Sequence, residues 1–471
     1  MIKRFILFLL IFSLLIPASS AFAQTATPPS GPVYIIQPGD SLSSIASRFG
    51  VILADLMAAN NITDANSISA GSQLLIPGLQ GITGILTTQV TGYGDTLISL
   101  SRSNQIDINF LRKLNHITSP SEIYAGTSLV LPKKENFTPF TSHIVLSKGE
   151  SLLEAAVSAN SDPWAVSQAN GLSGTWAGTP GDVLYNPSGS VVDAGPSGLP
   201  SAFGKVTVKP LPMLQGGTSE IIIHTQPGVT LGGTLVDKPL HFFKMDNGDY
   251  AALEGIHAML EPGAYPLSLQ ATLPDGTTQS FEQMIIIQSG NYPRSVMLEV
   301  DPETIDPAVT GPEDKQVATI TTPATPAKLW QGMFSLPVDP AFCQKAGFGE
   351  RRAFNGSDYV YFHAGLDFGV CSPLHPFDIY AAADGVVVFT GTLVVRGNAT
   401  IIDHGWGIYT GYWHQKQIEV NVGDHVKAGQ LIGQIGDTGR VTGPHLHFEV
   451  WVNGVQVNPT GPTGWLKNTY P

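Results

Sequence analysis

The stretch "TGPHLHFEV" (residues 442–450) places two histidines, His445 and His447, on either side of one leucine near the C-terminus. In an extended strand, side chains at alternate positions point to the same face, so both imidazoles would enter one space. Such a pair also occurs where one ring packs in a core and the other caps a turn. The chemistry of the surrounding sequence has to decide between these two interpretations.

Three more candidate groups precede this pair. The stretch "FHAGLDFG" contains His363 and Asp367, and "YTGYWHQ" contains His414. A spacing of four keeps His363 and Asp367 on one face of a strand or a helix, and the neighbouring glycines favour a strand with a turn. Two imidazole nitrogens and one carboxylate oxygen suit Zn²⁺, which in catalytic sites keeps its fourth position for water. Five candidate groups exceed three ligands, so two remain to serve as acid, base or electrophile.

The flanking sequence consists of short apolar runs separated by glycine turns, such as "AAADGVV" and "VGDHVKAGQLIGQIGDTGR". Together with the three histidine motifs, it resembles the lysostaphin/LytM-type zinc metallopeptidases over residues 342–459. The resemblance implies a mostly antiparallel β fold that cleaves peptide bonds in peptidoglycan. It also implies one Zn²⁺ and two kinds of site residue. The ligands would be His363, Asp367 and His447, while His414 and His445 would activate the water and stabilise the oxyanion.

Three other histidines of this region, His375, His404 and His425, lie in turns outside the motifs. We interpret them as structural or solvated, because isolated histidines are commonly packed or exposed without a chemical role.

The N-terminal half contains three copies of one pattern, "PGDSLSSIASRFGV", "YGDTLISLSRSNQI" and "KGESLLEAAVSANS", whose acidic residues lie 55 positions apart. Each copy reads as a strand, a turn, two helices of which the second ends in Asn, and a short closing strand. The pattern resembles the LysM domain, a βααβ module that binds N-acetylglucosamine-containing glycans such as peptidoglycan. We place the copies at residues 33–78, 88–133 and 142–188. The third is degenerate, with Lys148 and Glu150 in place of Pro and Asp, and copies can also serve only as spacers.

The region between the repeats and the histidine motifs alternates short apolar runs with turns, which predicts an all-β sandwich over residues 204–300. It is similar to the β-domain that precedes the peptidase in some secreted wall endopeptidases. Linkers are predicted at residues 189–203 and 301–329, and the metallopeptidase domain at 330–471. The sandwich histidines have no mutual spacing and are interpreted as surface or packed residues: His224, His241 and His257.

The chain begins with a secretory signal peptide, predicted over residues 1–23. Lys3 and Arg4 precede an apolar run that is short for a spanning helix, which needs about 20 residues. We therefore expect an exported protein without a transmembrane segment in its mature form, located outside the cell, in the wall or in the periplasm. In an exported chain the two cysteines, Cys343 and Cys371, can form a disulfide, with two buried free thiols as the alternative.

The formal net charge of -13 argues against nucleic acid and anionic lipid as partners, because both require a basic surface. The combined pattern predicts a secreted peptidoglycan hydrolase in which the repeats hold glycan and the zinc domain cuts peptide. Two alternatives are a non-catalytic wall scaffold or hydrolase activator of the same fold, and a zinc peptidase that acts on protein substrates. The complete set of ligand and accessory histidines disfavours the scaffold.

Overall fold

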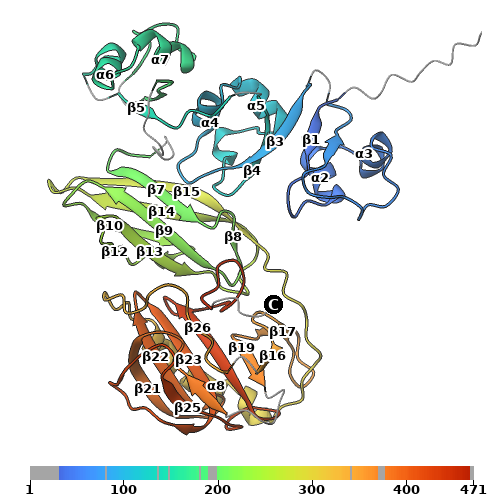
Figure 1. Ribbon diagram of the computed structural model, residues 1–471, viewed down its shortest axis with the longest axis vertical. Coiled ribbons are helices and arrows are strands. Elements are labelled where there is room, and N and C mark those ends of the chain that lie inside the picture. Colours follow the sequence, from blue (N-terminus) through green and yellow to red (C-terminus); the bar gives the residue numbers. More distant parts are fainter. Residues whose placement is uncertain are drawn as a thin grey trace, which may run out of the picture. The chain divides into compact units, whose positions relative to one another are not determined.

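The described residues of this computed structural model form three β-α-α-β segments, a domain of two β-sheets and a C-terminal β domain (Figure 1). The residues described are 31–79, 82–134, 137–146, 149–179, 182–188, 199–339, 342–369 and 377–466. The predicted signal peptide and most of the linker predicted at 189–203 lie outside them. Cys343 is disulfide-bonded, and its predicted partner, Cys371, lies outside the described residues.

Each β-α-α-β segment follows the predicted order of elements. The first contains β1 (Val33–Ile35), α2 (Leu42–Phe49), α3 (Leu53–Ala59) and β2 (Gln73–Leu75). The second contains β3 (Ile85–Val90), α4 (Leu97–Asn104), α5 (Ile108–Leu114), a 3-10 turn η1 (Pro120–Glu122) and β4 (Ser128–Pro132). The third contains β5 (His143–Val145), α6 (Leu152–Ser158), α7 (Pro163–Ala169) and β6 (Val183–Tyr185). The first segment, together with residues 82–87 and 132–134, belongs to one compact unit, and the remaining described residues belong to another.

The asparagine that recurs at the end of the second helix has the same role in all three segments. The side chains of Asn60, Asn115 and Asn170 each donate to the carbonyl of one residue of the closing strand and accept from its N–H. These six distances lie between 2.6 and 2.9 Å. The amide thereby replaces a missing strand neighbour, which explains why the repeat keeps Asn at this position.

The two-sheet domain consists of a four-stranded sheet, in the order β12-β13-β9-β7, and a five-stranded sheet, in the order β11-β10-β14-β15-β8. Alternate residues of both sheets, such as Ile221 in β9 and Leu267 in β14, share one core. The strands are β7 (Phe203–Lys209), β8 (Met213–Leu214), β9 (Thr218–Thr225), β10 (Thr230–Leu235), β11 (Lys238–Pro239), β12 (Phe243–Lys244), β13 (Tyr250–Gly255), β14 (Gly263–Thr272) and β15 (Thr278–Gln288).

The second segment is joined to strand β15 by backbone hydrogen bonds. The N–H of Ala125 donates to the carbonyl of Met284 over 2.9 Å, and the N–H of Ile286 donates to the carbonyl of Ala125 over 2.8 Å. Tyr93 is buried here, and its hydroxyl donates to the carbonyl of Leu267 over 2.9 Å. Burial raises the pKa of this phenol, so it stays protonated.

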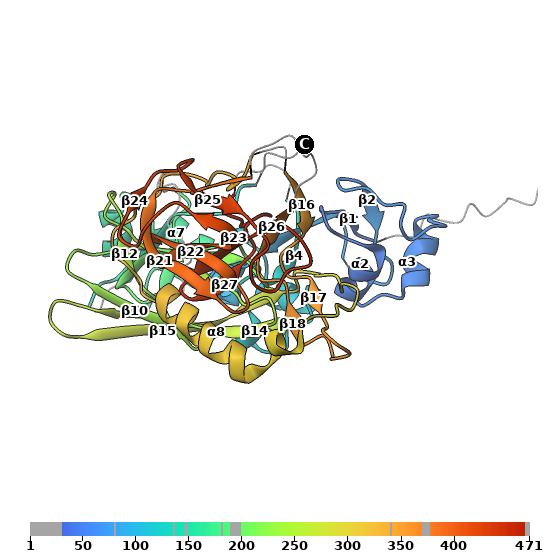
Figure 2. The same cartoon turned by 90° about the horizontal axis from the view of Figure 1, so that it is seen from below.

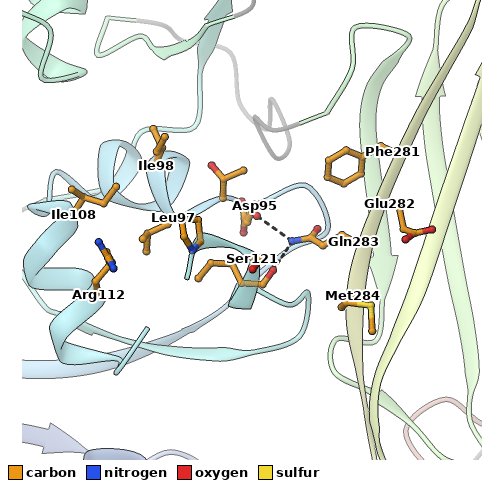
Figure 3. Close-up of a pocket in the computed structure, with 13 residues that line it drawn as sticks. Asp95, Leu97, Ile98, Ile108, Arg112, Ser121, Phe281, Glu282, Gln283 and Met284 are labelled. Atoms are coloured by element: carbon orange, nitrogen blue, oxygen red, sulfur yellow. Dashed lines mark hydrogen bonds between the residues drawn. The ribbon is translucent and has the colours of Figure 1, made fainter. Parts of the chain in front are cut away.

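The side-chain amide of Gln283 adds further hydrogen bonds between the second segment and strand β15. It donates to the carbonyls of Asp95 and Ile123 over 3.1 and 2.9 Å, and it accepts from the N–H of Gly94 over 2.7 Å. A cavity of about 630 Å³ remains beside it, between the start of α4 and β15 (Figure 3). The first and third segments carry Pro38 and Lys148 at the position of Tyr93, so this tyrosine distinguishes the second repeat.

Tyr93→Phe is expected to weaken the contact between the second segment and strand β15, because it leaves buried carbonyls without their donor. An unmade buried hydrogen bond costs about 1–3 kcal/mol, so amide exchange at Ala125 and Ile286 should accelerate about tenfold or more. Hydrogen–deuterium exchange with mass spectrometry measures this rate. Tyr265→Phe is the matched control, because that hydroxyl bonds to Glu261 in an exposed position. Unchanged amide exchange in Tyr93→Phe would show that the hydroxyl does not stabilise the contact with β15.

The C-terminal domain is built on a ten-stranded sheet with the main order β16-β19-β26-β23-β22-β21-β24. In addition, β25 pairs with β20 and β23, and β27 pairs with β26, while β17 and β18 form a separate hairpin. The strands are β16 (Cys343–Ala346), β17 (Arg351–Arg352), β18 (Tyr361–Phe362), β19 (Leu366–Gly369), β20 (Asp378–Tyr380), β21 (Gly385–Leu393), β22 (Gly397–Gly405), β23 (Ile408–Ile418), β24 (His425–Val426), β25 (Leu431–Ile435), β26 (His445–Val452) and β27 (Val455–Val457).

The two-sheet domain packs directly against the C-terminal domain. Phe243 stacks on Trp406 with ring centroids 5.2 Å apart, and both belong to the same buried cluster as the sheet interior. The side-chain amide of Asn453 donates to the carbonyl of Leu253 over 2.7 Å. The two domains therefore share apolar core and hydrogen bonds along this contact.

The linker prediction for residues 301–329 is wrong over its first two thirds, where the chain forms a 3-10 turn η2 (Pro302–Ile305) and helix α8 (Pro307–Thr321). Asp306 caps the helix and Pro307 occupies its first turn, which are ordinary start signals. The helix lies against the sheet (Figure 2), where Val317 joins the buried cluster around Trp413. A peptidase fragment should therefore begin before residue 302 rather than at 330.

Among the described residues, no single helix is long and apolar enough to cross a membrane. The pair α2 and α3, bent by 107°, passes such a test only when both helices are counted together.

Candidate metal centre

Three adjacent strands bring the predicted site residues together. Asp367 in β19 and His447 in β26 are direct antiparallel partners, and His414 follows Trp413, the partner of His447 on the next strand, β23. The close approach of β19 to β26 requires glycine at position 365, where a Cβ atom would lie 2.1 Å from the carbonyl oxygen of Phe448. The glycine in "HAGLD" is thus part of how the sequence builds the site.

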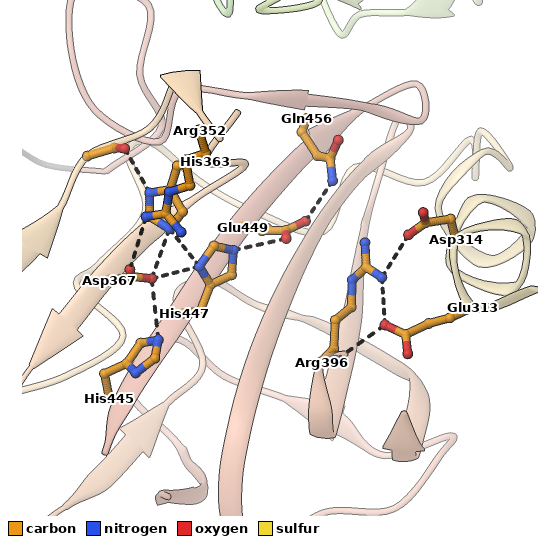
Figure 4. Close-up of polar contacts among 11 residues, drawn as sticks. Glu313, Asp314, Arg352, His363, Asp367, Arg396, His445, His447, Glu449 and Gln456 are labelled. Carbon is orange, nitrogen blue, oxygen red and sulfur yellow. Dashed lines mark hydrogen bonds and ion pairs between the residues drawn. The ribbon is translucent and has the colours of Figure 1, made fainter. Parts of the chain in front are cut away.

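Three of the side chains converge on one point (Figure 4). The Nε2 atom of His363 lies 2.9 Å from Oδ1 of Asp367 and 2.9 Å from Nδ1 of His447. The Nδ1 atom of His447 lies 2.7 Å from the same Oδ1. These are the three residues predicted as metal ligands, and each offers one ligand atom to the same space.

The outer contacts of the two histidines decide which nitrogen faces the cluster. Nδ1 of His363 lies 2.8 Å from the carbonyl of Gly347, so it carries the proton. Nε2 of His447 lies 3.0 Å from Oε1 of Glu449, which also requires a proton on that nitrogen. Nε2 of His363 and Nδ1 of His447 are therefore the nitrogens that face the carboxylate of Asp367. Two imidazole nitrogens and one carboxylate oxygen that lie 2.7–2.9 Å from one another are a donor set that suits Zn²⁺.

The charges of Asp367 and His447 follow from these contacts. Burial raises the pKa of Asp367, but the contacts with His363 and His447 outweigh it and hold this pKa well below its usual range. Burial lowers the pKa of His447, but its contacts with Asp367 and Glu449 raise it to about 9. The carboxylate is therefore ionised, and the cluster attracts positive charge.

The two remaining histidines flank these three. His414 is buried, with its ring centroid 4.9 Å from that of His445 and 6.1 Å from that of His447. Each has its Nδ1 held by a carbonyl: Thr438 for His414 at 2.7 Å and Gly443 for His445 at 2.8 Å. Nε2 of His445 lies 3.6 Å from Oδ1 of Asp367.

His414 is unusual in two respects. It has a positive φ of 62°, which a non-glycine residue adopts at a cost and which is common at functional sites. Burial, followed by the charges of His447 and His445, lowers its pKa to about 3, so the ring is neutral near pH 7. Its backbone N–H donates to the carbonyl of Arg396 over 2.9 Å.

The cluster opens into a groove with a cavity volume of about 1120 Å³. Helix α8 lines it, and Glu313 and Asp314 of that helix lie 2.7 and 2.9 Å from Nη1 of Arg396 (Figure 4). The backbone carbonyl of Arg396 accepts a hydrogen bond from the N–H of His414. Through Arg396, helix α8 therefore supports the backbone at that histidine. His257 of the two-sheet domain reaches the same groove, with its ring 5.2 Å from Phe362.

Sequence reasoning missed Glu449, the buried partner of His447, although both residues lie on one face of β26 and the motif "HFE" contains it. It also missed Arg352, Arg396 and Arg440 in the groove, since their positions depend on distant contacts. Of the histidines outside the motifs, His404 is buried against the carbonyl of Asp384, and burial lowers its pKa to about 4. His425 is exposed, and His375 lies outside the described residues.

Residues 361–459 match the model of peptidase family M23, and residues 34–77 and 92–132 match the LysM domain. The third β-α-α-β segment lies outside these matches. All five predicted site residues fall within residues 361–459.

Among curated proteins, the chain is 42% identical over 122 residues to peptidoglycan DD-endopeptidase ShyA of Vibrio cholerae, covering 26% of this chain and 28% of ShyA. It is 41% identical over 97 residues to DD-carboxypeptidase/endopeptidase Mpg of Neisseria meningitidis, covering 21% and 22%. The chain thus spans about a quarter of the length of these relatives. The solved catalytic domain of lysostaphin from Staphylococcus simulans is 31% identical, with a TM-score of 0.22, over 25% of this chain and 89% of that one. This chain therefore carries a C-terminal domain of peptidase family M23, the lysostaphin type, behind N-terminal LysM domains.

Proposed function

We propose that this protein is an exported zinc endopeptidase that cleaves peptide bonds of peptidoglycan and is held on wall glycan by its LysM domains. The observation that carries the proposal is the convergence of His363, Asp367 and His447 at the base of a groove with two further histidines beside them. The similarity to ShyA, a peptidoglycan DD-endopeptidase, supports the substrate class, and the similarity to Mpg, a DD-carboxypeptidase/endopeptidase, supports peptide cleavage.

The chain's residues divide into three roles in this proposal. His363, Asp367 and His447 would hold Zn²⁺, with Gly347 and Glu449 fixing the orientation of the two imidazoles. When bound, zinc would supply Lewis acidity toward the scissile carbonyl and the attacking water.

His414 and His445 would handle the protons. Both have Nδ1 fixed by a carbonyl, so Nε2 is the nitrogen free to act. One of them accepts a proton from the attacking water, and the other, protonated at Nε2, donates to the oxygen that gains negative charge. The histidine that accepts this proton would then donate it to the leaving amine.

The LysM domains would provide anchoring, since linked modules act at raised local concentration on an insoluble substrate. The third segment shares the β-α-α-β order and the asparagine that bonds to the closing strand, and we propose it as a degenerate LysM module. Export by the signal peptide at residues 1–23 would place the protein in the wall, the periplasm or the medium.

The decisive test is digestion of purified peptidoglycan by the zinc-loaded full chain, with the products identified by mass spectrometry. New peptide termini within stem or cross-link peptides are expected, and treatment with a chelator should abolish them. Release of sugar fragments without cleaved peptides would reject the proposal. A zinc-loaded protein that binds wall but cleaves no peptide would favour the scaffold instead.

Deletion of residues 33–78 is expected to weaken binding to insoluble wall at least about tenfold, because avidity gained from linked modules is lost. The rate on a soluble peptide should remain within about twofold, since the first repeat and the metal site lie in separate compact units. Sedimentation with purified wall measures the first quantity, and a soluble peptide assay the second. Equal sedimentation with and without the repeat would contradict its anchoring role.

A further inference from the structure

The groove contains three arginines whose charges are balanced to different degrees. Arg396 is paired with Glu313 and Asp314 of helix α8. Arg352 in β17 lies 3.7 Å from the outer oxygen, Oδ2, of Asp367. Arg440 lies in the loop between β25 and β26, and among the described residues no carboxylate forms an ion pair with it.

The surroundings of Arg440 fix the guanidinium, while the charges of Glu313 and Asp314 act on it only from a distance. Its Nη1 donates to the carbonyl of Thr304 over 2.8 Å, and its guanidinium carbon lies 4.9 Å from the centre of the Phe354 ring. Burial, and then the like charges of Arg396 and Arg352, lower its pKa. A guanidinium remains charged even so, and such a site attracts an anion.

We propose that Arg440 binds a carboxylate of the peptide substrate in the groove. This inference rests on the proposed function and adds the chemical class of the substrate, a peptide with a free carboxylate near the bond that is cut. Arg440 and the five predicted site residues line one cavity of about 1120 Å³, so one extended peptide can contact Arg440 and the metal site together.

The chemistry of the side chain favours this ligand. A guanidinium has five donors, and the carbonyl of Thr304 takes one, so a planar pair of donors can remain for a carboxylate. The ring of Phe354 beneath the guanidinium holds its plane in place, which reduces the entropy lost on binding. In a peptide the carboxylate is either the C-terminus or an acidic side chain, including that of a diamino acid.

A purely structural role is the competing explanation, because Arg440 also ties the η2 turn to the loop before His445. A tie of that kind would affect every substrate in the same way. Carboxylate binding would affect only substrates that carry the group. The two roles therefore differ in substrate dependence rather than in total activity.

The experiment uses the zinc-loaded full chain and three matched peptides: one with all carboxylates free, one amidated at its C-terminus, and one amidated on the acidic side chain. Arg440→Gln should raise KM for the free peptide about tenfold or more with kcat little changed, because a hydrogen bond to a charged group contributes about 1.5–3 kcal/mol. For the peptide amidated at the recognised carboxylate, wild type and variant should have the same KM. Whichever amidated peptide loses the effect identifies the source of the carboxylate.

Arg440→Lys should fall between wild type and Arg440→Gln, because it keeps the charge and loses the paired donors. Arg294→Gln is the matched control, since Arg294 also lies over an aromatic ring, at 5.2 Å from the centre of Tyr359, but does not line the groove. Equal losses on all three peptides, or no loss on any, would overturn the inference. If wild type cleaves no peptide, the proposed function fails, and calorimetric binding of the same peptides still tests the Arg440 contact.

Discussion

His447→Ala is expected to lose both zinc and almost all peptide hydrolysis. The substitution removes one of three converging ligand atoms, and a site with two protein ligands holds zinc weakly. It also leaves Glu449 buried and without the imidazole that it contacts at 3.0 Å. Lewis acidity contributes several kcal/mol, and each 1.36 kcal/mol is tenfold in rate, so activity should fall by at least about 10³-fold.

Zinc content by mass spectrometry and the rate on a soluble peptide measure the two losses on the same folded protein. His425→Ala is the control, because this histidine belongs to the same sheet but is exposed and lies apart from the cluster. The control should retain both zinc and activity. A His447→Ala protein that is folded by circular dichroism and still holds one zinc would remove His447 from the ligand set.

Much of the fold follows from local and periodic information. The recurrence at 55 residues, with helix caps and a terminal asparagine in each copy, determined the β-α-α-β segments. The alternation of apolar residues indicated strands between the repeats and the histidine motifs. Tertiary contacts between segments follow from neither, so the burial of Tyr93 against β15 has no local signal.

The metal cluster could be predicted from the sequence because its residues occur in short motifs with strand spacing. His445 and His447 alternate along β26, and Asp367 faces His447 across one strand pair. Residues that reach the groove from elsewhere could not be predicted from the sequence, because only the folded chain brings α8 and its Glu313 to Arg396.

Helix α8 illustrates why composition misled the linker prediction. Pro312 and Gly311 lie inside the helix and favour irregular structure in an isolated peptide. The helix exists because Val317 is buried and Glu313 pairs with Arg396, which are tertiary contributions. A start signal at Asp306 and Pro307 was present in the sequence but is short and ambiguous among many prolines.

The second large effect concerns the two histidines that are not ligands. His445→Ala is expected to retain zinc, because His445 supplies none of the three converging ligand atoms. Its rate should fall by about 10²-fold or more, the usual scale of general acid–base or oxyanion contributions. His414→Ala should behave alike, because its Nδ1 is also fixed by a carbonyl and its other nitrogen remains free to act.

The two variants can be separated by zinc content and by kcat measured together. Since neither residue is a ligand in this assignment, both variants should bind zinc like wild type while kcat falls and KM changes little. Gln417→Ala, on the same strand as His414 but exposed, is the control and should match wild type in all three quantities. Zinc retained in His447→Ala and lost in His445→Ala would reverse the two roles. Full activity in His445→Ala or in His414→Ala would remove that histidine from the chemistry, because a group that moves a proton in the transition state cannot be deleted without a loss of rate.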